Sequence, residues 1–440
     1  MKKIFVLLVL AAAVLLLVPA ASAAPTTYNS GFQVQNLSDQ VANIVIEFYG
    51  KGGAGVVKTV EDSIDPNDSN TYFPLAVDPG FDGSVVINSD QPVAAITNVL
   101  GDGFAFGASY VGFDGGANEV SVPLVMRNNG GFDTWFNVQN AGTATTQVTV
   151  AFDGKPDCNE TRTIEPGEAA TFDQTGNTCL GNTYVGAATV TAGSGGSIVA
   201  TVLETGAQTL FAYNGFTGGS TDLVMPLVQA NNANYHTGIQ IQNAGDVATT
   251  VTVSYTPSDA GSACTETQTI SAGASKTFAL NAFSFDFSPT NTTCVKEKWV
   301  GSAAVSANSA NQPLVGIVNQ TTLADKGSAY NAFDPSTATD KLVMPLIMDR
   351  NGGFFTGFNV QNVGSSATVT CNFAGTSASA SGTLGNGEAL TDVQLNSIAN
   401  GYVGSATCTA GAGGAIIGVV NELKFGAGDL LYTYEATNTN

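Results

Sequence analysis

One segment occurs four times in this chain, and that repetition limits the folds open to it more than any other feature. Its four copies are Phe32-Gln-Val-Gln-Asn36, Phe136-Asn-Val-Gln-Asn140, Ile239-Gln-Ile-Gln-Asn243 and Phe358-Asn-Val-Gln-Asn362, at intervals of 104, 103 and 119 residues. Two more markers recur in the same order, once in each of the last three repeats: a Pro-Leu segment at Pro123, Pro226 and Pro345, and a Val-Gly segment at Val185, Val300 and Val403. A repeat of about 100 residues has the size of a domain, not of a solenoid turn.

Inside each repeat the apolar residues alternate with polar ones, as Ile44, Ile46 and Phe48 do. This period of two predicts strands with one buried face, and turn residues interrupt the chain at short intervals. We therefore predict an all-β chain of four tandem Ig-like antiparallel β-sandwich domains, each with about seven strands. Their expected ranges are 24–121, 122–223, 224–342 and 343–440. The connecting segments are too short to be flexible linkers, so we expect a semi-rigid rod.

The N-terminus carries an export signal. Two lysines, Lys2 and Lys3, precede an apolar run from Ile4 to Val18, and the small residues Ala21-Ser22-Ala23 follow. This order is that of a secretory signal peptide, which we place at residues 1–23. The run is shorter than the roughly 20 residues that span a bilayer, and no second long apolar segment follows. We expect a bacterial protein that is secreted or held at the cell surface, without membrane insertion.

The charge balance excludes several partners. The chain has 14 Lys+Arg against 35 Asp+Glu, a formal net charge of −21, and it has no basic cluster beyond the N-terminus. Such an acidic chain offers no surface that neutralises phosphates, so nucleic acid is not expected as a partner. Its single histidine, His236, cannot build a His-rich zinc site.

Six cysteines in an exported chain are expected to form disulfides. Cys158 and Cys264 precede similar segments in repeats 2 and 3, and Cys179 and Cys294 each stand just ahead of the Val-Gly marker. We therefore predict the pairs Cys158–Cys179 and Cys264–Cys294. In repeat 4, Cys371 and Cys408 replace inward-facing apolar residues of the other repeats, which predicts a third bridge, across the sandwich.

Two sets of residues are candidate sites. Asp62, Asp65 and Asp68 lie in the densest acidic stretch and could offer oxygen ligands to Ca²⁺, although their spacing is not that of a known calcium loop and a solvated turn is favoured. Beyond this calcium possibility we expect no metal or cofactor. The second set lies in the loops that open the repeats, where aromatic and basic side chains could stack on a sugar or bury themselves against the preceding domain, the latter being favoured. It consists of Arg127, Phe132, Trp135, Tyr235, Arg350 and Phe354.

We do not expect an enzyme. A serine hydrolase would need a Gly-x-Ser-x-Gly elbow, which the chain lacks, and His236 is interpreted as a loop residue. A carboxylate pair for glycoside hydrolysis depends on three-dimensional separation, which sequence does not give. A tyrosine late in each repeat, at Tyr110, Tyr213, Tyr330 and Tyr432, is expected to be structural, with a hydroxyl that caps a corner.

A resemblance supports the domain interpretation. Asn140-Ala-Gly142, the strand Val148 to Phe152 and the segment Thr163 to Ala170 resemble the first half of the cell-adhesion-related and other Ig-like modules of bacterial surface proteins. Asn243-Ala-Gly245 repeats the pattern in repeat 3, whereas repeat 1 departs from it with Asn36-Leu-Ser38. The resemblance implies an extracellular, non-catalytic module that acts in surface display or adhesion.

Two functional hypotheses follow. The first is a secreted, non-catalytic cell-surface or extracellular-matrix protein with a structural or adhesive role, whose partners are itself or other cell-envelope proteins. The alternative is a secreted carbohydrate-binding or substrate-capture protein that uses the interdomain loops and binds glycans.

Overall fold

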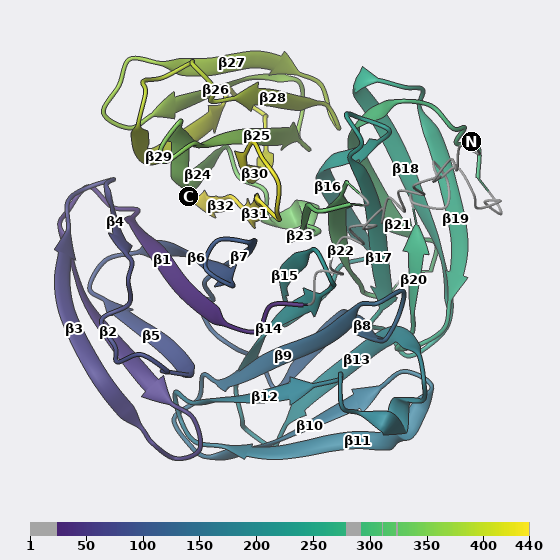
Figure 1. Cartoon of the computed structure of the whole chain (residues 1–440). Helices are drawn as coiled ribbons and strands as arrows, with labels where there is room; N and C mark the ends of the chain where they lie inside the picture. The colour runs from purple at the N-terminus through teal and green to yellow at the C-terminus, as the bar shows by residue number, and fades with distance from the viewer. Residues whose placement is uncertain (1–23, 279–291, 310, 323, 440) are drawn as a thin grey trace, which may run out of the picture.

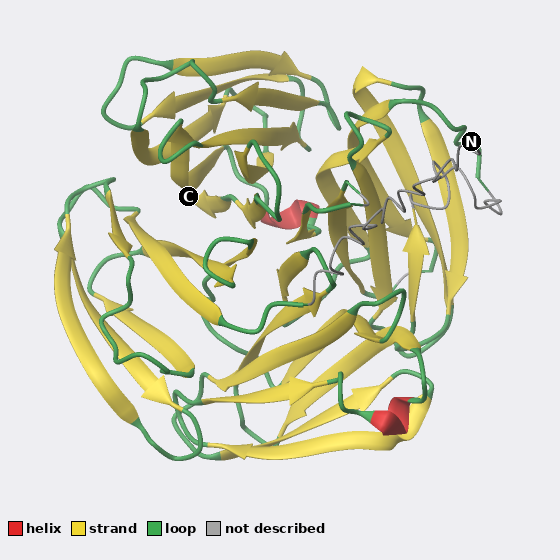
Figure 2. Ribbon diagram, viewed as in Figure 1, coloured by secondary structure: helices red, strands yellow, loops and turns green. Residues whose placement is uncertain are grey.

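The computed structural model describes residues 24–278, 292–309, 311–322 and 324–439, so the predicted signal peptide lies outside the described residues. Figure 2 shows that antiparallel strands make up nearly all of the regular structure. The helical segments of the described residues are two short 3-10 turns, η1 (Thr178–Leu180) and η2 (Pro335–Thr337). No helix in these ranges is long and apolar enough to cross a membrane.

The strands follow the four repeats of the sequence. Repeat 1 contains β1 (Tyr28–Asn36), β2 (Ala42–Gly50), β3 (Val56–Ile64), β4 (Ser69–Tyr72), β5 (Gly83–Ser89), β6 (Val93–Gly101) and β7 (Phe106–Val111). Repeat 2 contains β8 (Glu119–Arg127), β9 (Asp133–Asn140), β10 (Thr146–Phe152), β11 (Lys155–Ile164), β12 (Ala169–Asp173), β13 (Tyr184–Ala192), β14 (Ile198–Thr205) and β15 (Leu210–Asn214). Repeat 3 contains β16 (Asp222–Ala230), β17 (His236–Asn243), β18 (Thr249–Ala260), β19 (Cys264–Ile270), β20 (Ser275–Phe278), β21 (Trp299–Ala307), β22 (Leu314–Thr321) and β23 (Gly327–Asn331). Repeat 4 contains β24 (Lys341–Asp349), β25 (Phe354–Asn362), β26 (Ala367–Phe373), β27 (Ser379–Leu384), β28 (Ala389–Val393), β29 (Tyr402–Ala410), β30 (Ile416–Lys424), β31 (Leu431–Glu435) and β32 (Thr437–Thr439).

Each repeat forms two antiparallel sheets that enclose one apolar core. In repeat 2 the outer sheet has the order β11-β10-β13-β8 and the inner sheet has the order β12-β9-β14-β15. Repeats 3 and 4 keep both orders, and repeat 4 adds β32 beside β24. Val150 of the outer sheet and Phe136 and Val202 of the inner sheet are all buried in one cluster, because alternate residues of each strand face the opposite sheet.

The four repeats close into a ring. In Figure 1 they follow one another around a centre that holds the last inner strand of each repeat, β7, β15, β23 and β31. Neighbouring members of this set are in contact, including β31 of repeat 4 with β7 of repeat 1. Across this closing junction, Asn98 Nδ2 donates a hydrogen bond to Glu422 Oε2 at 3.2 Å. The predicted rod is therefore wrong, because side chains at every junction, the last included, bind the inner sheets together.

One residue at the centre, Asp429, binds all three other repeats. Asp429 of repeat 4 accepts hydrogen bonds from the backbone N of Leu210 in repeat 2, at 2.5 Å, and of Gly327 in repeat 3, at 2.7 Å. Its own backbone N donates to the carbonyl oxygen of Ala105 in repeat 1, at 2.9 Å. Asp429 is fully buried, and this burial raises the pKa of its carboxyl well above the usual value.

A tyrosine of the last inner strand binds the leading strand of the same repeat. The hydroxyls of Tyr213, Tyr330 and Tyr434 each donate to the carbonyl oxygen of the leucine after the marker proline, at 2.5 Å. Tyr434 is paired with Val420 in repeat 4, and Tyr213 is paired with Val202, the equivalent valine of repeat 2. The equivalent of Tyr213 in repeat 4 is therefore Tyr434. The sequence pattern had indicated Tyr432, and that assignment is wrong.

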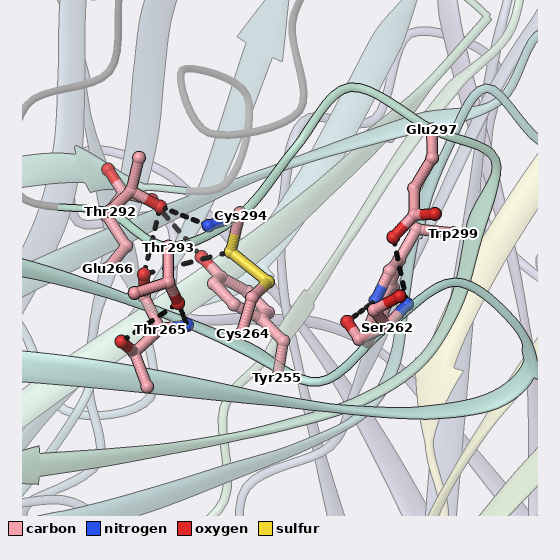
Figure 3. Close-up of a disulfide and its surroundings, with 10 residues drawn as sticks. All are labelled: Tyr255, Ser262, Cys264, Thr265, Glu266, Thr292, Thr293, Cys294, Glu297 and Trp299. Atoms are coloured by element: carbon pink, nitrogen blue, oxygen red, sulfur yellow. Dashed lines mark hydrogen bonds between the residues drawn. A yellow bond between two sulfur atoms is a disulfide. The ribbon is translucent and has the colours of Figure 1, made fainter.

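The structure contains three disulfides, and they join the cysteines paired above. Figure 3 shows Cys264–Cys294 at the start of β19, where Thr292 Oγ1 accepts a hydrogen bond from Cys294 N at 3.0 Å. Nearby, Trp299 Nε1 donates to the carbonyl oxygen of Ser262 at 2.9 Å. These contacts hold the long β18–β19 hairpin against β21, on the periphery of the ring.

The third bridge differs from its prediction. Cys371 on β26 and Cys408 on β29 are both fully buried, as expected of residues at inward positions. They are paired neighbours in one sheet, however, so the bridge does not cross the sandwich. Equivalent pairs in the other repeats are Ile46 with Ile87, Val150 with Val190, and Val253 with Val305.

Candidate interdomain grooves

Two consecutive positions on β6, β14, β22 and β30 carry the polar contacts between repeats. Strand register aligns the first position as Asn98, Leu203, Asn319 and Asn421, and the second as Val99, Glu204, Gln320 and Glu422. The first position of each repeat faces the second position of the preceding one. The contacts are Asn319 Nδ2 to Glu204 Oε2 at 2.7 Å, Gln320 Nε2 to Asn421 Oδ1 at 3.0 Å, Asn98 Nδ2 to Glu422 Oε2 at 3.2 Å, and an apolar cluster holding Val99 and Leu203.

Side-chain size also alternates from junction to junction. Gly327 of repeat 3 lies beneath the ring of Phe211 of repeat 2, and a Cβ added at Gly327 would lie 2.4 Å from Phe211 Cζ. At the junction of repeats 1 and 2 the sizes are reversed. There the following repeat supplies the large side chain, Leu210, which shares an apolar cluster with the small Ala108 of the preceding repeat. The junctions therefore alternate between Gly against an aromatic ring and Leu against a small residue.

The two junctions that combine a glutamate with an aromatic ring each contain a groove. Groove 2/3, between repeats 2 and 3, has a volume of about 620 Å³. Groove 4/1, between repeats 4 and 1, has a volume of about 200 Å³. Equivalent residues line both: Leu124, Met126, Phe132, Glu204, Phe211, Gly238, Gln240 and Asn319 in the first, and Leu346, Met348, Phe354, Glu422, Tyr432, Gly31, Gln33 and Asn98 in the second.

A tryptophan fills the corresponding space between repeats 1 and 2. Trp135 occupies the position of Gly31, Gly238 and Gly357, one residue before the marker segment. Its ring contacts Tyr28 with centroids 5.5 Å apart and packs against the cluster of Val99, Leu203 and their neighbours. A glycine at this position leaves room for a groove, whereas the indole occupies that room.

A glutamate with a raised pKa lies in each groove. Glu204 and Glu422 are almost fully buried, and burial raises the pKa of each carboxyl to about 8. The hydrogen bonds from Asn319 and Asn98 lower these pKa values but only in part. No lysine or arginine is among the described residues that line either groove.

Several groove atoms lack partners among the described residues. Glu204 Oε1 and Asn319 Oδ1 in groove 2/3, and Glu422 Oε1 and Tyr432 Oη in groove 4/1, are buried polar atoms with no hydrogen-bond partner in these ranges. A buried polar group without a partner costs roughly 1–3 kcal/mol, and such groups are rare in folded proteins. Unsatisfied acceptors beside apolar walls are typical of a site that a ligand completes.

The aromatic residues predicted in the opening loops are divided between these junctions. Phe132 lines groove 2/3 and contacts Phe211 with ring centroids 5.8 Å apart, and Phe354 lines groove 4/1 and contacts Tyr432 at 5.6 Å. Trp135 makes the interdomain contact just described, whereas Tyr235, the equivalent of Phe132 in repeat 3, is in the lining of neither groove.

The two arginines of these loops bind within their own repeats. Arg127 donates to the carbonyl oxygen of Gly181, and Arg350 donates to Asp349 Oδ1 and Asn396 Oδ1, both at 2.6 Å. Burial raises the pKa of Asp349, but the hydrogen bonds from Arg350 and from backbone N–H groups outweigh it and hold that pKa below the usual value. The arginines therefore fix the loops and take no part in either groove lining.

The other candidate residues do not form a site. Asp62 accepts hydrogen bonds from Tyr72 and Asn70, and no group of acidic, cysteine or histidine residues suited to a metal occurs in the described ranges. His236 begins β17, and partial burial lowers its pKa. Each groove is lined by one carboxyl group of the described residues, so neither contains the carboxylate pair that glycoside hydrolysis requires.

Sequence reasoning missed Glu204, Asn319, Glu422 and Asn98. A signal was present, because only repeats 2 and 4 carry glutamate two residues after the core position of Val202 and Val420. No protein-family model matches the chain, and no curated protein matches it. The functional argument therefore depends on the geometry of the grooves.

Proposed function

We propose that this chain is an exported, non-catalytic capture protein that binds small molecules in its interdomain grooves. The observation that carries the proposal is the pair Glu204 and Asn319, which presents two unpartnered acceptors beside the apolar walls of groove 2/3. The ligand would have an apolar body, for Leu124, Met126 and Phe132, and a hydrogen-bond donor for the two acceptors. The single carboxyl in each groove supports binding rather than acid–base catalysis by a residue pair.

Export and the Ig-like character of the four repeats belong to the same proposal. Three disulfides are compatible with an extracellular protein, and the sequence of residues 1–23 supports secretion. The ring gives such a protein rigid walls for its grooves, since ligand sites built between packed sheets need little reorganisation on binding.

The test uses 2-phenylethanol, a neutral molecule with an aromatic body and one hydroxyl, and saturation-transfer NMR with the chain from residue 24. We expect binding to the unmodified protein and a clear loss when Phe132→Ala and Phe354→Ala are combined. Tyr235→Ala is the matched control, because Tyr235 holds the equivalent position outside both grooves. Equal binding by the double variant would contradict the proposal.

A structural or adhesive role is the second candidate, and the outer sheets favour it. Their exposed faces carry cross-strand hydroxyl pairs such as Thr252 with Thr267 and Thr368 with Thr383, at 3.2 and 3.1 Å. Strands β3, β11 and β27 are outer-sheet edges within the described residues, and exposed edges can pair with another chain. Ordered filaments or sheets in electron micrographs would support this role, and separate single rings at high concentration would oppose it.

A further inference from the structure

We infer that groove 2/3 binds an organic ammonium ion, whose nitrogen lies between Glu204 and Asn319 and whose apolar body contacts Phe132. The inference rests on the proposed capture function and names the ligand class for one of the two grooves. Both unpartnered atoms of this groove, Glu204 Oε1 and Asn319 Oδ1, are acceptors. A primary ammonium suits them because it has three donors and no acceptor.

Charge supports a cation over a neutral donor. The carboxyl of Glu204 is almost fully buried, and the lining of groove 2/3 within the described residues contains no basic side chain. An ammonium ion hydrogen-bonded to Glu204 would stabilise the ionised carboxylate and lower its raised pKa, which offsets the cost of desolvation. The net charge of −21 also raises the local concentration of cations around the protein.

The aromatic walls support the same class of ligand. Phe132 and Phe211 lie edge to face in groove 2/3, with an angle of 65° between the rings. Such rings attract a cation near their faces and pack against an alkyl or aryl body. Gly206, next to β14, brings backbone against the ring of Phe132.

Groove 4/1 already has an internal cation at this place. Lys424 is the equivalent of Gly206, and its Nζ lies 5.2 Å from the centroid of the Phe354 ring. Asn98 Oδ1, the equivalent of the unpartnered Asn319 Oδ1, accepts a hydrogen bond from Ser109. The unpartnered atoms of groove 4/1 are Glu422 Oε1 and Tyr432 Oη, and the second is a hydroxyl that can donate as well as accept. Groove 4/1 therefore lacks a pair of pure acceptors and has a competing lysine, which is why the inference is restricted to groove 2/3.

Isothermal titration calorimetry with 2-phenylethylamine and 2-phenylethanol tests the inference, because these probes differ only in the ammonium or hydroxyl group. We expect the amine to bind at least about tenfold more tightly, as a charge-assisted hydrogen bond requires. Glu204→Gln should abolish this preference while the alcohol still binds. Glutamine occupies the equivalent position in repeat 3, as Gln320, so the variant is expected to fold. Glu435→Gln, a buried carboxyl outside both grooves, is the control and should keep the preference.

The possible results separate the two proposals. Equal affinity for amine and alcohol, or the same loss in Glu204→Gln and Glu435→Gln, would overturn the ammonium inference and leave the capture function standing. Binding of a neutral disaccharide such as cellobiose in place of the amine would overturn it in the same way. Failure of both phenylethyl probes and of cellobiose to bind the unmodified protein would overturn the capture function as well.

Discussion

The ring of Tyr432 in repeat 4 lies against the backbone of Gly107 in repeat 1, and a Cβ added at Gly107 would lie 1.7 Å from Tyr432 Cε1. This contact closes the ring between the first and last repeats. Gly107→Ala should therefore destabilise the protein by about 1–3 kcal/mol, as overpacked cores do, in denaturant unfolding. Gly115→Ala is the control, because its added Cβ would meet no atom within 4 Å.

A size exchange tests the same junction more sharply. The junction of repeats 1 and 2 pairs Leu210 with Ala108, so Gly107→Leu combined with Tyr432→Ala would reproduce that pair at the junction of repeats 4 and 1. We expect each single variant to be less stable than the double variant, because only the double variant restores complementary sizes. Additive losses in the double variant would show that the two side chains do not pack together.

Stability should fall as pH rises from about 4.5 to about 8. Burial raises the pKa of Glu435 to about 7 and those of Glu204 and Glu422 to about 8, from a usual 4.5. Between these values the folded protein binds more protons than the unfolded chain, so its free energy of unfolding decreases with pH and levels off above pH 8. Thermal unfolding should give a higher Tm at pH 5.5 than at pH 8.5. A higher Tm at pH 8.5 would contradict this.

Glu435 takes the place of an asparagine in the central hydrogen-bond chain. Asn331 Nδ2 donates to the carbonyl oxygen of Asn214 at 2.7 Å, and Asn331 Oδ1 accepts from Asn214 N at 3.0 Å. At the next junction Glu435 Oε1 accepts from Asn331 N. Glu435→Gln keeps an acceptor and removes the ionisable group, so it should raise the Tm at pH 8.5 and change it little at pH 5.5. A lower Tm at pH 8.5 would contradict this role.

The disulfide inside the sheet of repeat 4 replaces a valine pair. Cys371→Val with Cys408→Val would copy Val150 and Val190 of repeat 2, and it should fold with a loss of about 2–4 kcal/mol from the missing cross-link. The double serine variant should lose more, because two hydroxyls would then be buried in an apolar core. Equal losses in denaturant unfolding would show that packing at this pair contributes little.

Periodicity and repetition predicted the strands and the cysteine partners because those features depend on residues within one repeat. Cys371 and Cys408, for example, align with Val150 and Val190 by spacing alone. The prediction of a bridge across the sandwich was wrong because Cys371 and Cys408 lie on neighbouring strands of one sheet. The sequence indicates that both side chains face the core, but it does not indicate which of the two sheets contains each strand.

The ring and the grooves could not be predicted in this way. They depend on contacts between repeats, such as Asn98 with Glu422, whose partners are 324 residues apart. Phe132 and Phe354 were recognised as junction residues, whereas Glu204 and Glu422 fall inside strands that looked like ordinary core strands. Comparison of equivalent positions across repeats becomes informative only after register fixes which positions are equivalent.

Ring closure is the central claim, because the grooves lie between repeats and groove 4/1 requires the first and last repeats to meet. Small-angle X-ray scattering on the chain from residue 24 measures it most directly. A closed ring of four compact repeats should have a radius of gyration of about 25 Å, since a compact chain of this length has about 22 Å. A value of roughly 40 Å, as four such domains in a line would give, would contradict the account.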